Sequence, residues 1–111
     1  MGQSTDAILA YGYVWDEEVD EDEFAPEEAN NLWGDEHPVQ IGYHCSCDYS
    51  MPYVYVTKSR RLASRGYPIA IDAREIGTPD SWVSLLADFC QKHNIDVGEK
   101  QPGWFLCSMW C

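Results

Sequence analysis

The first half of the chain contains no lysine and no arginine. Residues 1–57 hold 13 acidic side chains, whereas residues 58–111 hold all seven basic residues and six acidic ones, so the net charge is −12. A negative field of this size repels nucleic acids and anionic membranes and attracts basic surfaces. We therefore expect no nucleic-acid binding and no membrane binding, and a host protein with a basic surface as the partner.

The sequence also lacks long apolar runs and the common catalytic motifs. No segment has the length and apolar character of a membrane span or an export signal. A Walker loop, a G-x-G-x-x-G turn, a G-x-S-x-G elbow and an H-E-x-x-H pair are missing. The five cysteines form an odd-numbered set, which favours reduced thiols. We expect a cytoplasmic protein that is not an enzyme and has no cofactor.

The apolar pattern predicts one α+β domain over residues 1–111. Apolar spacings of three and four over about 79–93 predict the main helix, with Thr78 as its N-cap. Pro26 and the acids after it predict a short acidic helix over about 26–33. We expect four or five mostly antiparallel strands with the main helix across one face. The expected strands are 7–15, 39–46, 53–57, 69–73 and 104–110, with a helical turn at 59–66.

Residues 16–38 form an acidic excursion from this domain, which we call the acidic segment. Eleven carboxylates lie within residues 16–36. Charge repulsion predicts a solvated loop at 16–23, whereas Phe24, Leu32 and Trp33 are expected to fix the segment to the body. Carboxylates held in this way imitate the spaced charge of a nucleic-acid backbone and fit a basic groove of another protein.

Aromatic side chains flank the acidic segment and complete the predicted binding surface. If residues 7–15 are extended, Tyr11, Tyr13 and Trp15 share one face, which is either open for a partner or a homodimer, or capped by residues 24–33. The candidate partner-binding residues are Asp16, Glu17, Glu18, Asp20, Glu21, Asp22, Glu23, Glu27, Glu28, Trp33, Tyr11, Tyr13 and Trp15.

Three other interpretations stay open. The acids can form a plain solvated surface, or pair internally with the basic residues Lys58, Arg60, Arg61 and Arg65. An aromatic pocket can sequester a nucleotide-like signal, with its phosphate held by Arg60, Arg61, Arg65 and Arg74. Zinc can stabilise an interaction module if His44, Cys45, Cys47, Cys90 and His93 meet, although the usual C-x2-C pair is missing, so we expect no metal site.

Three phrases of the sequence carry a resemblance. MGQSTDAILAYGYVWDEE (1–18), NNLWGDEHPVQIGYHCSCDYSMPYV (30–54) and PGWFLCSMW (102–110) resemble a family of small acidic proteins encoded by tailed bacteriophages of actinobacteria. The resemblance covers nearly the whole chain. It implies expression in the cytoplasm of an infected bacterium and an accessory role toward host or defence machinery. It assigns no activity and no catalytic residues.

Overall fold

The computed structural model describes residues 5–32, 34, 36–46, 49–77 and 79–110. It confirms a small α+β fold. The strands are β1 (Thr5–Val14), β2 (Val39–Ser46), β3 (Tyr49–Val56), β4 (Arg61–Ala63) and β5 (Gly103–Trp110). The helices are α1 (Glu21–Phe24), α2 (Glu27–Asn30) and α3 (Asp80–Lys92), with 3-10 turns at Thr57–Ser59 and Ala73–Glu75.

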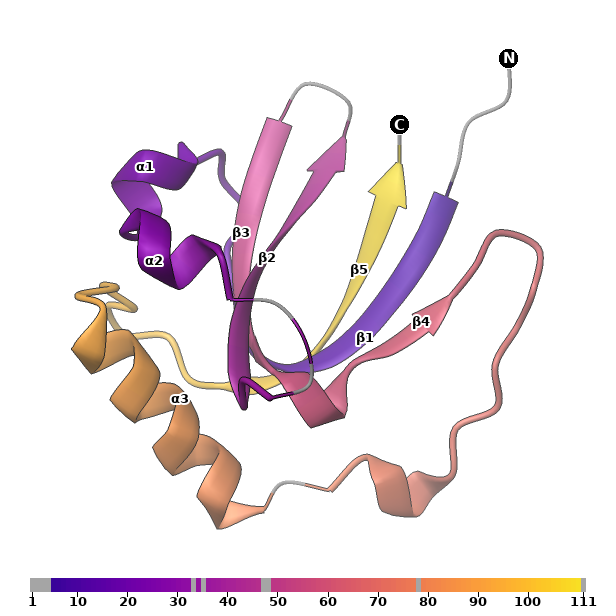
Figure 1. Ribbon diagram of the computed structural model, residues 1–111. Helices are drawn as coiled ribbons and strands as arrows, with labels where there is room; N and C mark the ends of the chain where they lie inside the picture. Colours follow the sequence, from indigo (N-terminus) through magenta and orange to yellow (C-terminus); the bar gives the residue numbers. More distant parts are fainter. Residues whose placement is uncertain (1–4, 33, 35, 47–48, 78, 111) are drawn as a thin grey trace.

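Strand β1 is the centre of the sheet, as its apolar sequence predicts. It pairs antiparallel with β5 along one edge and with β3 and then β4 along the other. Strand β2 runs antiparallel to β3 and meets β5 in parallel at Ser46 and Trp110. The pairings β1–β5–β2–β3–β1 therefore form a closed circuit, and the sheet is strongly curled. Figure 1 shows β3, β2, β5 and β1 side by side across the upper end of the sheet.

Each face of β1 packs into a separate apolar cluster. Tyr11 and Tyr13 lie in the larger cluster together with Leu86 and Cys90 of α3. Ile8 and Ala10 point to the opposite face and lie in a smaller cluster that includes Tyr53, Tyr55 and Cys107. Because successive side chains of a strand alternate between faces, this arrangement follows directly from the order of residues in β1.

The described α-helices α1, α2 and α3 lie on the side of the larger cluster. Ala25, Ala29 and Leu86 are buried in that cluster, so the acidic segment and α3 cover the same face (Figure 1). The predicted main helix is confirmed as α3, with Pro79 in the N-cap position, while Thr78 lies outside the described residues. None of the described helices is long and apolar enough to cross a bilayer.

The strand β3 begins earlier than the sequence suggests, because Met51 and Pro52 lie inside it. The carbonyl oxygen of Pro52 accepts a hydrogen bond from the backbone N–H of Trp15 at 3.0 Å. In a strand, the nitrogen and the carbonyl of one residue point to the same side. The missing N–H of Pro52 therefore faces the β1 side, and the ladder between β2 and β3 loses no donor.

Residues 59–73 also differ from the prediction. Arg61–Ala63 is a strand where a helical turn is expected, because it pairs with residues 7–9 of β1. Residues 69–73 are not a strand. Pro68 lacks a donor for sheet pairing, and the side chain of Asp72 accepts a hydrogen bond from the backbone N–H of Arg74, which starts a 3-10 turn.

Close contact between β1 and β3 requires glycine at position 12. A Cβ atom there would overlap the carbonyl oxygen of Val54 and lie 2.8 Å from the Cα of Tyr55. Both obstacles are backbone atoms, which cannot move without shifting the sheet. Gly103 faces Gly12 in the β1–β5 register, and a Cβ added at Gly103 meets nothing within 4 Å.

We expect Gly12→Ala to reduce the free energy of unfolding by about 3 kcal/mol or more, because the added methyl group separates two paired strands. Gly103→Ala is the matched control and is expected to change it by less than about 1 kcal/mol. Urea denaturation of both variants measures the difference. Equal losses would mean that β1 and β3 do not approach as described.

Candidate functional site

The acidic segment contains two one-turn helices instead of the single helix predicted at about 26–33. The turn α1 forms within the charge run that was expected to be a loop, and α2 ends at Asn30. Both turns carry acids at their amino-terminal ends, where exposed backbone N–H groups favour negative charge. The backbone between them is extended at Ala25 and Pro26.

The side chain of Asn30 joins the two turns to each other and to the sheet. Its Nδ2 atom donates to the carbonyl oxygens of Glu21 at 3.1 Å and of Ala25 at 3.0 Å. Its Oδ1 atom accepts from the hydroxyl of Tyr43 in β2 at 2.5 Å. One amide therefore adds a second hydrogen bond to the carbonyl of Glu21, bonds the carbonyl of Ala25, and connects the acidic segment to a strand.

Aromatic packing supplies the apolar part of this attachment. The ring of Phe24 stands edge-on to Trp15, with centroids 4.8 Å apart, and edge-on to Tyr43 at 6.3 Å. Ala25 is 4% exposed and Ala29 is 0% exposed, so the small side chains of the segment are buried against the body. The prediction that Phe24 fixes the segment is confirmed.

The carboxylates of the segment remain in solvent. All nine candidate carboxylates are exposed, and within the described part of the chain none takes part in an ion pair. They are Asp16, Glu17, Glu18, Asp20, Glu21, Asp22, Glu23, Glu27 and Glu28. A cation close to the segment is Lys100, whose Nζ lies 5.5 Å from the ring centroid of Trp15.

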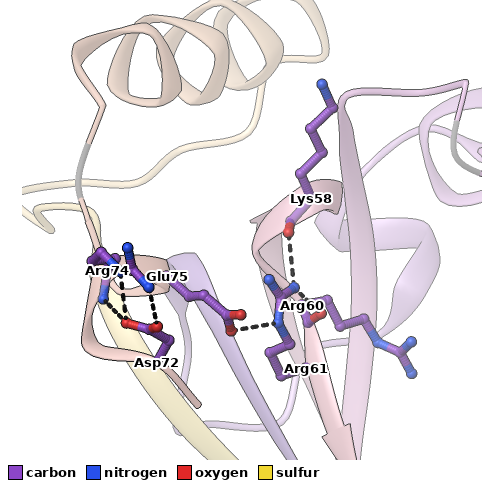
Figure 2. A network of polar contacts seen from close by, with 6 residues as sticks. All are labelled: Lys58, Arg60, Arg61, Asp72, Arg74 and Glu75. Atoms are coloured by element: carbon purple, nitrogen blue, oxygen red, sulfur yellow. Dashed lines mark hydrogen bonds and ion pairs between the residues drawn. The ribbon is translucent and has the colours of Figure 1, made fainter.

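Two of the arginines pair with acids of their own region, as Figure 2 shows. The Nε atom of Arg61 lies 3.3 Å from a carboxylate oxygen of Glu75. The guanidinium of Arg74 lies 2.8 Å from Asp72. Hydrogen bonds from Arg74 lower the pKa of the Asp72 carboxyl. The four arginines therefore do not converge on one phosphate-sized site, and these two do not neutralise the acidic segment.

The negative charges of the acidic segment affect the pKa of Tyr43. The pKa of the Tyr43 hydroxyl is raised to about 12, first by burial and then by the nearby charges of Glu21 and Asp22. The arrangement thus places fixed negative charge beside a phenol that also holds the segment in place.

The aromatic residues predicted to contact a partner lie beneath the surface. Tyr11 is 4% exposed, and Tyr13 and Trp15 are each 7% exposed. Their rings pack on α3 and on the acidic segment, so they support the segment from beneath, which corrects the expectation that they anchor a partner directly. Trp33 lies outside the described residues.

The described thiols and the buried histidine belong to the interior. Cys90 and Cys107 are free and buried, and burial raises the pKa of each thiol to about 11. A thiol in this state is a poor nucleophile at neutral pH. His93 packs on Phe89 with ring centroids 4.6 Å apart. The described residues contain no group of three possible metal ligands. Cys47 and the side chains of His44 and Cys45 are not among the parts of the chain that the structure describes.

Two attachment residues were missed by sequence reasoning. Asn30 and Tyr43 hold the segment, but an asparagine near a helix end and a tyrosine in an alternating strand are both ordinary patterns.

Comparisons with protein-family models, curated proteins and solved structures give no match for this chain.

Neutralising Glu21 and Asp22 together, as Glu21→Gln with Asp22→Asn, is expected to lower the pKa of Tyr43. The pKa of Tyr43 in this variant should still exceed 10.0, because burial is the largest cause of its upward shift. The 13C resonance of the Tyr43 Cζ atom, followed upward from about pH 9, reports the change. Glu17→Gln with Glu18→Gln removes the same charge elsewhere in the segment and serves as the control. An equal shift from both pairs would show that the segment is not fixed beside Tyr43.

Proposed function

We propose that this protein is a non-enzymatic binding protein whose acidic segment docks on a basic surface of another macromolecule. The observation that carries this proposal is a set of nine exposed carboxylates without internal ion pairs, on a segment attached to a packed body. The mechanism is steric and electrostatic occupation of the partner's site.

Fixed attachment distinguishes this segment from an ordinary solvated charge run. A flexible acidic tail loses conformational entropy when it binds, which weakens the complex. Here, Asn30 and the packing of Phe24 hold the turns before any partner arrives. Charges in a preset arrangement also attract a complementary surface from a distance and speed association.

The class of partner follows from the charge pattern. Closely spaced carboxylates on one surface are a substitute for phosphates, so a groove that normally holds nucleic acid is the complementary site. The resemblance to actinobacteriophage proteins adds a setting, the cytoplasm of an infected bacterium, and a target among host or defence proteins.

Replacing Asp20, Glu21, Asp22 and Glu23 by Asn or Gln is expected to slow association roughly tenfold or more, because steering charge is lost. The first test is a pull-down from an actinobacterial lysate, with the captured partner then used for association kinetics. Raising the salt from about 0.1 M to about 1 M shortens the Debye length from about 10 Å to about 3 Å and should release the partner.

The matched control replaces four exposed acids outside the segment, namely Asp80, Asp88, Asp96 and Glu99. It changes the net charge equally and should retain the partner. If both variants lose the partner to the same extent, net charge alone explains binding. If neither loses it, the acidic segment has no part in the mechanism.

A further inference from the structure

A cleft of about 540 Å³ lies between the acidic segment and the β2–β3 hairpin. Its polar lining includes the amides of Asn31 and Gln40, the phenols of Tyr43, Tyr53 and Tyr55, and the guanidinium-bearing Arg60. Its volume is in the range of about 300–1,000 Å³ that is usual for small-molecule sites. We call it the tyrosine cleft.

The floor of the tyrosine cleft is held in place by strand β2. A Cβ atom at Gly42 would overlap the ring of Tyr53 and lie 2.6 Å from its hydroxyl oxygen, so glycine lets this ring lie against the strand. The hydroxyl of Tyr55 donates to Oε1 of Gln40 at 3.0 Å, and Nε2 of Gln40 donates to the carbonyl oxygen of Gly34. The phenols are therefore positioned before any ligand binds.

Arg60 is the cationic group of the cleft. Its side chain makes no hydrogen bond or ion pair with the residues that the structure describes, in contrast to Arg61 and Arg74. In Figure 2 its guanidinium points away from the pair formed by Arg61 and Glu75. Burial raises the pKa of Tyr53 and of Tyr55, and the positive charge of Arg60 lowers both. The charge of Arg60 therefore acts on the phenols of the cleft.

We propose that the tyrosine cleft binds a small ring compound that carries one anionic group, either a phosphate or a carboxylate. The guanidinium of Arg60 binds the anionic group through two parallel hydrogen bonds, a geometry that suits both anions. The cleft is far larger than an inorganic ion needs, and its aliphatic and phenolic walls with the amide of Asn31 suit a flat ring with polar edges. Of the proposed docking carboxylates, this site includes Glu21.

The charge of Glu21 opposes this binding. Glu21 lines the same cleft, and like charges of ligand and protein repel. Glu21→Gln is therefore expected to tighten binding of the anionic ligand, whereas loss of acids weakens docking on a basic partner. The two proposals predict opposite effects of the same substitution, so failure of one does not resemble failure of the other.

Isothermal titration calorimetry with four probes tests the proposal. Adenosine 5′-monophosphate supplies a ring with a phosphate, nicotinate a ring with a carboxylate, adenosine a ring without charge, and inorganic phosphate a charge without a ring. Saturable binding of either anionic ring compound, with at least about tenfold weaker binding of adenosine and of phosphate, supports the proposal. No binding of either anionic ring compound, or equal binding of adenosine, overturns it.

The variant Arg60→Gln should weaken binding of the anionic ring compound by roughly tenfold or more, because a charge-assisted hydrogen-bond pair is lost. Arg74→Gln is the matched control, since its side chain is 90% exposed and pairs with Asp72 away from the cleft. It should leave the affinity unchanged within about twofold. Equal weakening by both variants, or none by Arg60→Gln, would overturn the role of Arg60.

Discussion

The packing of Phe24 between Trp15 and Tyr43 is the contact on which the placement of the acidic segment depends. Nine like charges on a short segment favour an expanded chain, and two such charges about 6 Å apart repel by roughly 0.7 kcal/mol in water. Phe24 is half-buried, so its burial contributes less than the roughly 1.5–3 kcal/mol of a fully buried ring, and each edge-on aromatic pair adds about 0.5–1.5 kcal/mol. The hydrogen bonds of Asn30 act in the same direction. The contacts of Phe24 and Asn30 together therefore outweigh the repulsion between several pairs of carboxylates in the acidic segment.

The position of the basic residues preserves the negative potential of the segment. Arg61 and Arg74 lie near β4 and the connection that follows it, where Glu75 and Asp72 pair with them. Figure 1 places β4 on the side of the sheet away from α1 and α2. The unequal charge of the two halves of the sequence thus becomes a separation in space, even though β1 of the first half pairs with β4 and β5 of the second. The acidic segment contributes Glu21, Asn30, Asn31 and Leu32 to the tyrosine cleft, and of these only Glu21 is among the carboxylates that we propose for docking.

Much of the fold follows from the sequence because periodic apolar residues report directly on burial. The strand at residues 7–15 and the main helix were predicted from the spacing of their apolar residues, and Leu86 lies on the apolar face predicted for the helix. Pro52 misled the prediction, because its effect depends on which neighbour its nitrogen faces. Residues 69–73 misled it as well, since Ile69 and Ile71 alternate as in a strand but have no partner strand beside them.

The site was only half predictable for a related reason. Charge is a property of composition, so the acidic segment was visible from the sequence. Whether Tyr11 and Trp15 face a partner or the interior depends on where Phe24 returns to the sheet, and that is a long-range contact. Arg60 lines the tyrosine cleft, whereas Arg61 and Arg74 pair with acids elsewhere. The direction that Arg60 takes depends on the turn at residues 57–59 that precedes it.

The most direct measurement is 15N relaxation of the backbone amides of residues 20–30, compared with those of β1. If the acidic segment is held as we describe, its order parameters should match those of the sheet at about 0.85, and Asn30→Ala should lower them. Values below about 0.6 in the unaltered protein, beside a rigid β1, would show that the carboxylates are carried on a mobile segment, and the account of a preset docking surface would be wrong.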